Sequence, residues 1–128
     1  MLMRVGSVAM NKRKSTPAGL LEQKCEKAWS AKILARDPVC RSCKVRKSVH
    51  PHHLVKRSQS LAVKFDLDNG IGLCVLCHNR AESSPADGVL VAYETVGFRA
   101  FEALVDRSRE IIYSAPPSWF AERLEALK

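Results

Sequence analysis

The sequence predicts an α+β fold, in which a small core held together by a bound metal ion lies between an N-terminal helix and a C-terminal helical tail. Apolar residues repeat at helical spacing before the core and again after it. Two CxxC pairs enclose a segment with strand character, and their cysteines are Cys40, Cys43, Cys74 and Cys77. We therefore expect the core at residues 40–82 and the tail at residues 86–127.

The N-terminal helix has a start signal, an apolar face and a stop signal. Thr16 followed by Pro17 is typical of a helix N-cap and first turn, and Asp37 followed by Pro38 ends the pattern. One apolar face recurs every fourth residue, at Leu21, Cys25, Trp29 and Ile33. Residues 1–15 have no apolar period and predict a flexible basic leader. Residues 16–128 are then expected to form a single domain.

The core is expected to contain two strands and a helix. The stretch 45–55 can be extended, although Pro51 lacks an N–H donor and implies an edge or a bend. A second strand is predicted at 71–73, followed by a helix over 75–82. Beyond the break at 83–85, apolar spacing predicts three helices, separated at Gly97 and at Ala115-Pro116-Pro117.

Charge is distributed unevenly along the chain. The 128 residues carry a net charge of +8, and residues 1–64 hold 15 Lys and Arg against 3 Asp and Glu. Such an excess favours a polyanionic partner. The apolar run at the N-terminus is too short for a signal peptide, and no segment is long enough to span a membrane. We expect a cytoplasmic protein with no membrane association.

A cytoplasmic location disfavours disulfides, and it favours zinc as the ion that the paired cysteines bind. Thiolates two residues apart can share one tetrahedral ion, so two such pairs complete a structural site. Cys25 stands alone and is expected to be a small buried residue. The histidines are then left for another role, and they are His50, His52, His53 and His78. Imidazoles can bind a second metal ion or accept a proton.

Read in order, the central segment contains Cys40-x-x-Cys43, His52-His53, Asp68-Asn69-Gly70 and Leu73-Cys74-x-x-Cys77-His78-Asn79-Arg80. This arrangement resembles the zinc-bearing branch of the HNH endonuclease family over residues 40–80. The resemblance implies a treble-clef-like ββα-metal core, and the three residues that name the motif would be His53, Asn69 and His78. Cys40, Cys43, Cys74 and Cys77 would bind the structural Zn²⁺.

The same resemblance implies roles for the other residues. His53 would be the general base, while His52 and His78 would hold a catalytic divalent cation. Asn69 would pin the loop between the strands through hydrogen bonds to the backbone. Three basic side chains would contact phosphates around the cut, and these are Lys56, Arg57 and Arg80.

Resemblance to this family implies hydrolysis of DNA phosphodiester bonds to 5′-phosphate and 3′-hydroxyl ends. We expect nicking with little sequence specificity, because the candidate contacts are cations on phosphates. The DNA could be double-stranded or branched, and two-strand cleavage would need a dimer or two encounters. The chain could form a homodimer or bind a partner protein. The cation could be Mn²⁺, Mg²⁺, Ni²⁺ or Zn²⁺. His52 stands where many relatives have aspartate, which favours Mn²⁺ over Mg²⁺.

Two alternatives remain open from the residues alone. His50 and His52 share one face of an extended strand, so His50 is a rival ligand. The four cysteines alone also fit a non-catalytic zinc module that binds nucleic acid. A weaker similarity, in Val63-Lys64-Phe65-Asp66 and the helical tail, is to phage late-recombination nucleases of the lambda group, and it points to a phage or prophage origin.

Overall fold

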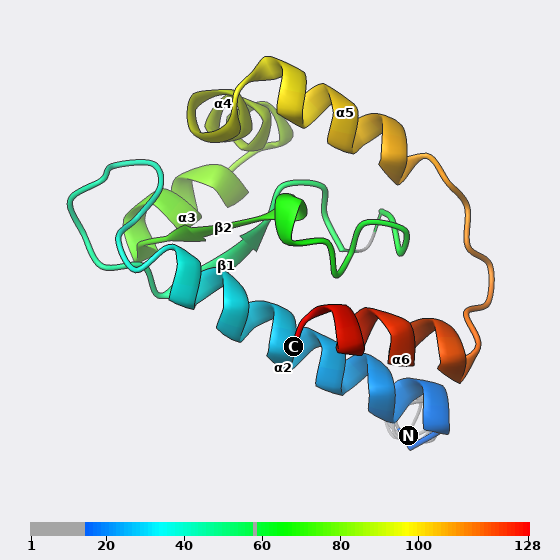
Figure 1. Ribbon diagram of the computed structural model, residues 1–128. Helices are drawn as coiled ribbons and strands as arrows, with labels where there is room; N and C mark the ends of the chain where they lie inside the picture. Colours follow the sequence, from blue (N-terminus) through cyan, green and yellow to red (C-terminus); the bar gives the residue numbers. More distant parts are fainter. Residues whose placement is uncertain (1–14, 58) are drawn as a thin grey trace, which may run out of the picture. The chain divides into compact units, whose positions relative to one another are not determined.

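The computed structural model describes residues 15–57 and 59–128. In chain order its elements are helix α2 (Pro17–Arg36), strand β1 (His50–His53), the 3₁₀ helix η1 (Leu67–Asn69), strand β2 (Gly70–Leu73), and helices α3 (Val75–Glu82), α4 (Pro85–Val96), α5 (Phe98–Ser108) and α6 (Pro117–Ala126) (Figure 1). A small α+β fold is confirmed, with the two strands and the helices near the predicted positions. The predicted leader lies almost wholly outside the described residues.

The described residues group into two compact units, one of residues 15–28 with 113–128 and one of residues 29–112. Helix α2 contributes its first turns to the smaller unit and its last turns to the larger. Among the described residues, no helix combines the length and the apolar character that a membrane crossing requires.

The smaller unit consists of the start of α2 and helix α6. The hydroxyl of Thr16 accepts a hydrogen bond from the Gly19 amide at 3.0 Å, which satisfies one of the free amides at the start of α2. Cys25 is fully buried, and its thiol donates to the carbonyl oxygen of Phe120 at 3.2 Å. The expectation of a small buried residue at position 25 is confirmed.

Strands β1 and β2 form an antiparallel pair at the centre of the larger unit. His50 lies opposite Leu73, and His53 lies opposite Gly70. Because successive side chains on a strand point to opposite faces, His52 and His53 project to different sides of this hairpin. The register therefore gives the rings of the two adjacent histidines different partners, His78 for His52 and Trp29 for His53.

The last turns of α2 pack closely against β2. A Cβ atom at Gly70 would lie 2.4 Å from Cζ2 of Trp29, and one at Gly72 would lie 2.8 Å from the carbonyl oxygen of Asp37. Only glycine fits at these two positions. The Asp37 carboxylate accepts a hydrogen bond from the Gly72 amide at 2.9 Å and pairs with Arg36, so the helix end is tied to the strand.

Helices α3 and α4 cover the hairpin through the main apolar cluster of the larger unit. Its buried members are Cys40, Ile71, Leu73, Cys74, Ala81 and Val91. A second cluster, of Val55, Val63 and Leu104, joins the loop after β1 to α5. Two of the four cysteines lie in the main cluster, so the predicted metal site belongs to the core of the fold.

Candidate metal centres

Four cysteines gather at one end of the hairpin. The sulfur atoms of Cys40, Cys43, Cys74 and Cys77 all lie within 4.8 Å of one another. The first pair sits on a tight turn, in which the Cys40 amide donates to the Arg46 carbonyl and Lys44 adopts a left-handed φ of 61°. The second pair opens α3, where Cys74 is the N-cap and its sulfur accepts from the Cys77 amide at 3.4 Å.

Backbone amides favour the thiolate form at two of these cysteines. Amides of Arg46 and Val45 donate to Cys43 and lower the pKa of its thiol to about 6. The Cys77 amide lowers the pKa of Cys74, whereas burial raises the pKa of Cys77 to about 11. Thiolate is the form that binds a metal ion. All five cysteines are free thiols, and the set of four fits a structural metal site.

A second cluster joins β1 to α3. Ligand atoms of His52, His78 and Glu82 lie within 4.8 Å of one another. The Glu82 carboxylate lies 3.4 Å from Nδ1 of His52 and 3.8 Å from Nε2 of His78. His52 is buried, but Glu82 is exposed. Three ligands would leave a coordination position of a bound ion open to water or another ligand.

Glu82 was not among the residues predicted from sequence. It stands four residues after His78 on α3, and residues at this spacing lie on the same helix face. That spacing was the available signal, although a His-Glu pair on a helix surface is common without a metal.

Burial keeps the two imidazoles of this cluster neutral. It lowers the pKa of His52 to about 4, and the nearby Glu82 carboxylate only partly opposes this effect. Burial also lowers the pKa of His78, with a further contribution from His50. Neutral imidazole is the form that binds a metal ion. Both rings are therefore ready to act as ligands at neutral pH.

His50 occupies a different place. Its ring stacks on the ring of His78, with centroids 4.4 Å apart and planes 17° apart. His52, rather than His50, is brought together with His78 and Glu82. His50 instead covers one face of the His78 ring.

His53 is held on the opposite side of the strand by two contacts. Its ring stacks on Trp29, with centroids 3.9 Å apart and planes 10° apart. Nε2 lies 2.9 Å from the carbonyl oxygen of Lys64. A carbonyl oxygen can only accept a hydrogen bond, so this contact places the proton of the neutral ring on Nε2 and the lone pair on Nδ1.

Asn69 fastens the loop that follows β1. Its side chain is fully buried. Oδ1 accepts from the Val55 amide at 2.7 Å, and Nδ2 donates to the carbonyl oxygens of Val55 and Val63 at 3.1 and 3.0 Å. These are the backbone hydrogen bonds expected of Asn69. They fix both ends of the loop that bears Lys56 and Arg57.

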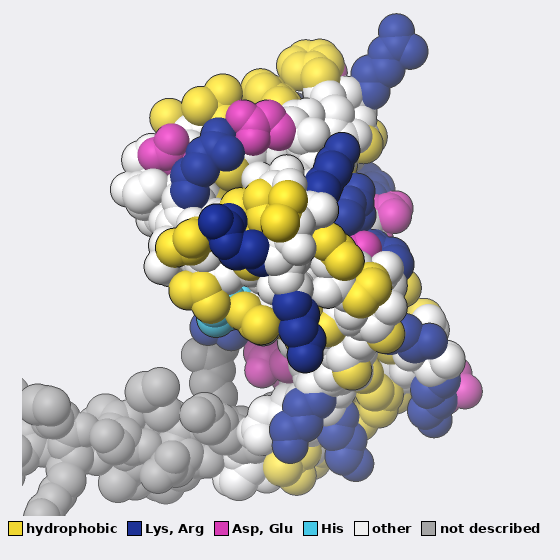
Figure 2. Space-filling model, turned by 90° about the vertical axis from the view of Figure 1, so that its left-hand side faces the viewer, with side chains coloured by type: hydrophobic (Ala, Val, Ile, Leu, Met, Phe, Trp, Pro, Cys, Tyr) yellow, Lys and Arg dark blue, Asp and Glu magenta, His cyan; other side chains and the backbone are white. Residues whose placement is uncertain are grey.

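Two of the predicted phosphate contacts have acidic neighbours. Arg80 forms a bidentate ion pair with Glu94, in which Nη2 and Nη1 lie 2.9 and 3.1 Å from the two carboxylate oxygens. Nζ of Lys56 lies 3.9 Å from a carboxylate oxygen of Glu82. Arg57 is exposed. Figure 2 shows Lys and Arg side chains spread over one face among hydrophobic ones, rather than gathered in one stripe.

Comparison of the chain with models of known protein families, with curated proteins and with solved structures gave no significant match.

Proposed function

We propose that the protein is a metal-dependent DNA endonuclease of the HNH type. The observation that carries the proposal is the cluster of His52 on β1 with His78 and Glu82 on α3, together with His53, the next residue on β1, which lines the same cavity as His52. The proposed core is the treble-clef-like ββα-metal unit, in which zinc bound by the four cysteines joins the turn at Cys40 to the start of α3.

The donor set of the second cluster fits a divalent cation. Two neutral imidazoles and one carboxylate suit first-row transition metals. A divalent cation there would neutralise the charge that develops on the phosphate and on the leaving 3′ oxygen. We propose Mn²⁺, Ni²⁺ or Zn²⁺ ahead of Mg²⁺, because imidazole is a softer ligand than the oxygen donors that Mg²⁺ prefers.

His53 would act as the general base. Its contact with Lys64 leaves the lone pair on Nδ1, and the stack on Trp29 limits rotation of the ring. A neutral imidazole can take the proton of an attacking water near pH 7, and such a transfer contributes about 10²- to 10⁴-fold to the rate. Asn69 would keep the adjoining loop rigid through its three backbone hydrogen bonds.

The proposed substrate is DNA, cut one strand at a time to 5′-phosphate and 3′-hydroxyl ends. One small site of this kind serves one phosphodiester bond. Two-strand cleavage would need a homodimer or two separate encounters with the DNA. Binding by Lys and Arg to phosphates would depend strongly on salt and little on sequence.

The test is nicking of supercoiled plasmid with Mn²⁺, Ni²⁺, Zn²⁺, Mg²⁺ or no added cation. The His53→Ala variant should lose about 10²- to 10⁴-fold of the nicking rate while it keeps its zinc and its affinity for DNA. His50→Ala is the comparison variant. It removes an imidazole of the same strand that stacks on His78 but is not one of the three ligands, and it should lose less of the nicking rate than His53→Ala.

A non-catalytic zinc module that binds nucleic acid is the second candidate, and it is favoured by the four-cysteine cluster and the net charge of +8. Such a module would bind plasmid without nicking it in any of these cations, and His53→Ala would change nothing. Nicking that is equal in wild type and His53→Ala would contradict the role proposed for His53.

A further inference from the structure

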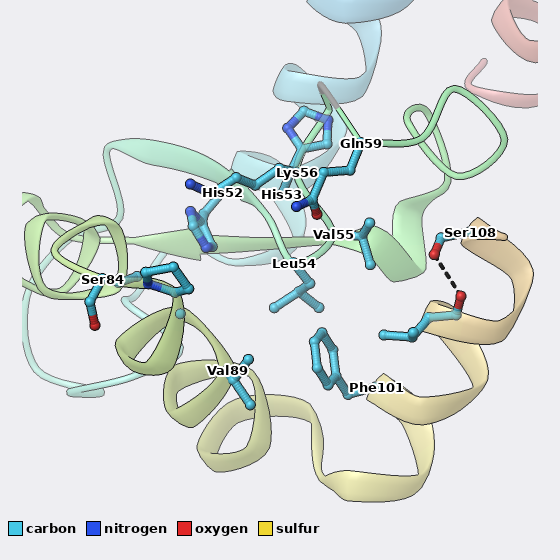
Figure 3. Close-up of a pocket in the computed structure, with 14 residues that line it drawn as sticks. His52, His53, Leu54, Val55, Lys56, Gln59, Ser84, Val89, Phe101 and Ser108 are labelled. Atoms are coloured by element: carbon cyan, nitrogen blue, oxygen red, sulfur yellow. Dashed lines mark hydrogen bonds between the residues drawn. The ribbon is translucent and has the colours of Figure 1, made fainter.

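A cavity of about 210 Å³ opens beside the candidate active site, in the larger unit. Figure 3 shows it between the end of β1, helix α4 and helix α5, with Phe101 and Val89 directed toward Leu54. The walls are mostly apolar. The polar side chains at its edge include His52, Lys56 and Gln59.

The cavity is lined in part by residues of the proposed active site. His52, a member of the three-residue cluster, and His53, the proposed base, both line it. A nucleic acid whose phosphate lay at the cluster would therefore have its next chemical group, a sugar and its base, at the mouth of the cavity.

The chemistry of the walls selects among these groups. A phosphate would lose hydration against Leu54, Val89 and Phe101 without gaining hydrogen bonds, which is costly. A base has apolar faces, which suit such walls, and a polar edge, which suits Lys56 and Gln59 at the rim. Aromatic side chains such as Phe101 bind bases through their faces with little regard to sequence.

We propose that this cavity receives one unpaired nucleobase next to the bond that is cut. A base inside a duplex is stacked and paired, so it would have to leave the double helix before it could enter the cavity. Entry of an already unpaired base costs less free energy, because no base pair has to be broken. The inference rests on the proposed endonuclease function and narrows its substrate to DNA with an unpaired nucleotide at a bulge, gap or branch.

A wall residue offers a variant that blocks the cavity without opening the core. Val89 lies on α4 and is 37% exposed, so Val89→Phe adds volume at the mouth. Leu90 is the next residue on the same helix and is 49% exposed, but it lies outside the cavity. Leu90→Phe is therefore the matched control for an added aromatic ring.

The experiment uses three duplexes of one sequence: fully paired, with one extra unpaired thymidine, and with an abasic residue at that position. With Mn²⁺, wild type and Leu90→Phe should cut the thymidine bulge about 5- to 150-fold faster than the abasic bulge, the range expected for stacking of one base. Val89→Phe should remove this difference. Anisotropy of the same labelled duplexes, without added divalent cation, measures the same preference in binding.

The outcomes separate the two proposals. Equal cutting and equal binding of the thymidine and abasic bulges by wild type would overturn the base pocket and leave the endonuclease standing. A binding preference for the thymidine bulge, with no cutting in any cation, would support the pocket and overturn the endonuclease. Loss of cutting by Val89→Phe to the same degree on both bulges would overturn the pocket, because it would assign Val89 a structural role only.

Discussion

The four-cysteine cluster takes its ligands from the turn before β1 and from the start of α3, and the His52-His78-Glu82 cluster takes its ligands from β1 and from α3, but the two sets differ in chemistry. The first has four sulfur ligands, two of them in the apolar core. The second has three ligands of mixed type, one of them exposed. A complete soft ligand set suits a permanent ion, whereas an incomplete set leaves a position for substrate.

The difference between the two clusters indicates how one short helix can serve both a structural site and a reactive site. Helix α3 begins at the first cluster, with Cys74 and Cys77, and carries His78 and Glu82 toward its end. The ion at the first cluster would fix the start of the helix, and the ligands further along would then face His52 in a set geometry. In the proposed function, the first cluster would provide rigidity and the second would depend on it.

The largest expected effect is on the structural side of this comparison. Cys74→Ser should remove the zinc and unfold the larger unit, because structural zinc contributes on the order of 10 kcal/mol, comparable to the whole stability of a domain. Zinc content and circular dichroism measure the result. Cys25→Ser, which alters the cysteine outside the cluster, should keep its zinc. A folded, metal-free Cys74→Ser protein would contradict the structural role.

The second effect tests the buried imidazole. The pKa of His52 is about 4 in the folded chain and near 6.5 in the unfolded one. The unfolded chain therefore takes up more protons between these values, so stability falls as pH falls through this window, by up to about 3 kcal/mol. Urea unfolding at pH 7.5 and pH 5 should show a smaller loss for His52→Asn. Parallel losses in the two proteins would contradict the burial effect.

The third prediction concerns the ligand that sequence reasoning missed. Glu82→Gln should weaken binding of Mn²⁺ at least about tenfold, since even groups outside the first ligand shell can contribute that much. Calorimetric titration of Mn²⁺ into the zinc-loaded protein measures the affinity without reference to nicking. Glu102→Gln, at an exposed carboxylate on α5, is the control. Equal affinity in both variants would remove Glu82 from the site.

The smallest effect tests whether Arg80, on the same helix as His78 and Glu82, contacts phosphate. If Arg80 contacts a phosphate, Arg80→Ala should reduce the slope of log affinity against log salt by about 0.9. Glu94→Gln should strengthen DNA binding, because it releases Arg80 from its ion pair. An exposed pair of this kind contributes only about 0–1 kcal/mol to folding, so stability should hardly change. An unaltered slope would make the pair purely structural.

The helices and strands whose signals lie within a few consecutive residues could be predicted from the sequence. Thr16 and Ser84 each accept a hydrogen bond from an amide three residues ahead, at Gly19 and Asp87, and such caps have local signatures. The helix over 75–82 was predicted from the length and composition of that segment and from the break at Ser83-Ser84-Pro85 that follows it, whereas its capping by Cys74 was not predicted. The pairing of two short strands followed from the motif between the CxxC pairs.

Contacts between distant segments could not be predicted. The stack of Trp29 on His53 joins residues of α2 and β1, and nothing in the local sequence indicates it. The choice between His50 and His52 depended on which ring faces Glu82, which the strand alternation leaves open. The assignment of residues 16–128 to one domain stays a prediction, as do the catalytic roles.

The close approach of α2 to β2 has a consequence for tracing related proteins. Gly70 and Gly72 face Trp29, Ile33 and Asp37 with no space for a methyl group. Positions 69–74 thus have the pattern Asn-Gly-x-Gly-Leu-Cys. Its two glycines are required by the close packing of a helix more than 30 residues upstream. A chain that keeps this approach of helix to strand would need glycine, or a residue equally small, at both positions.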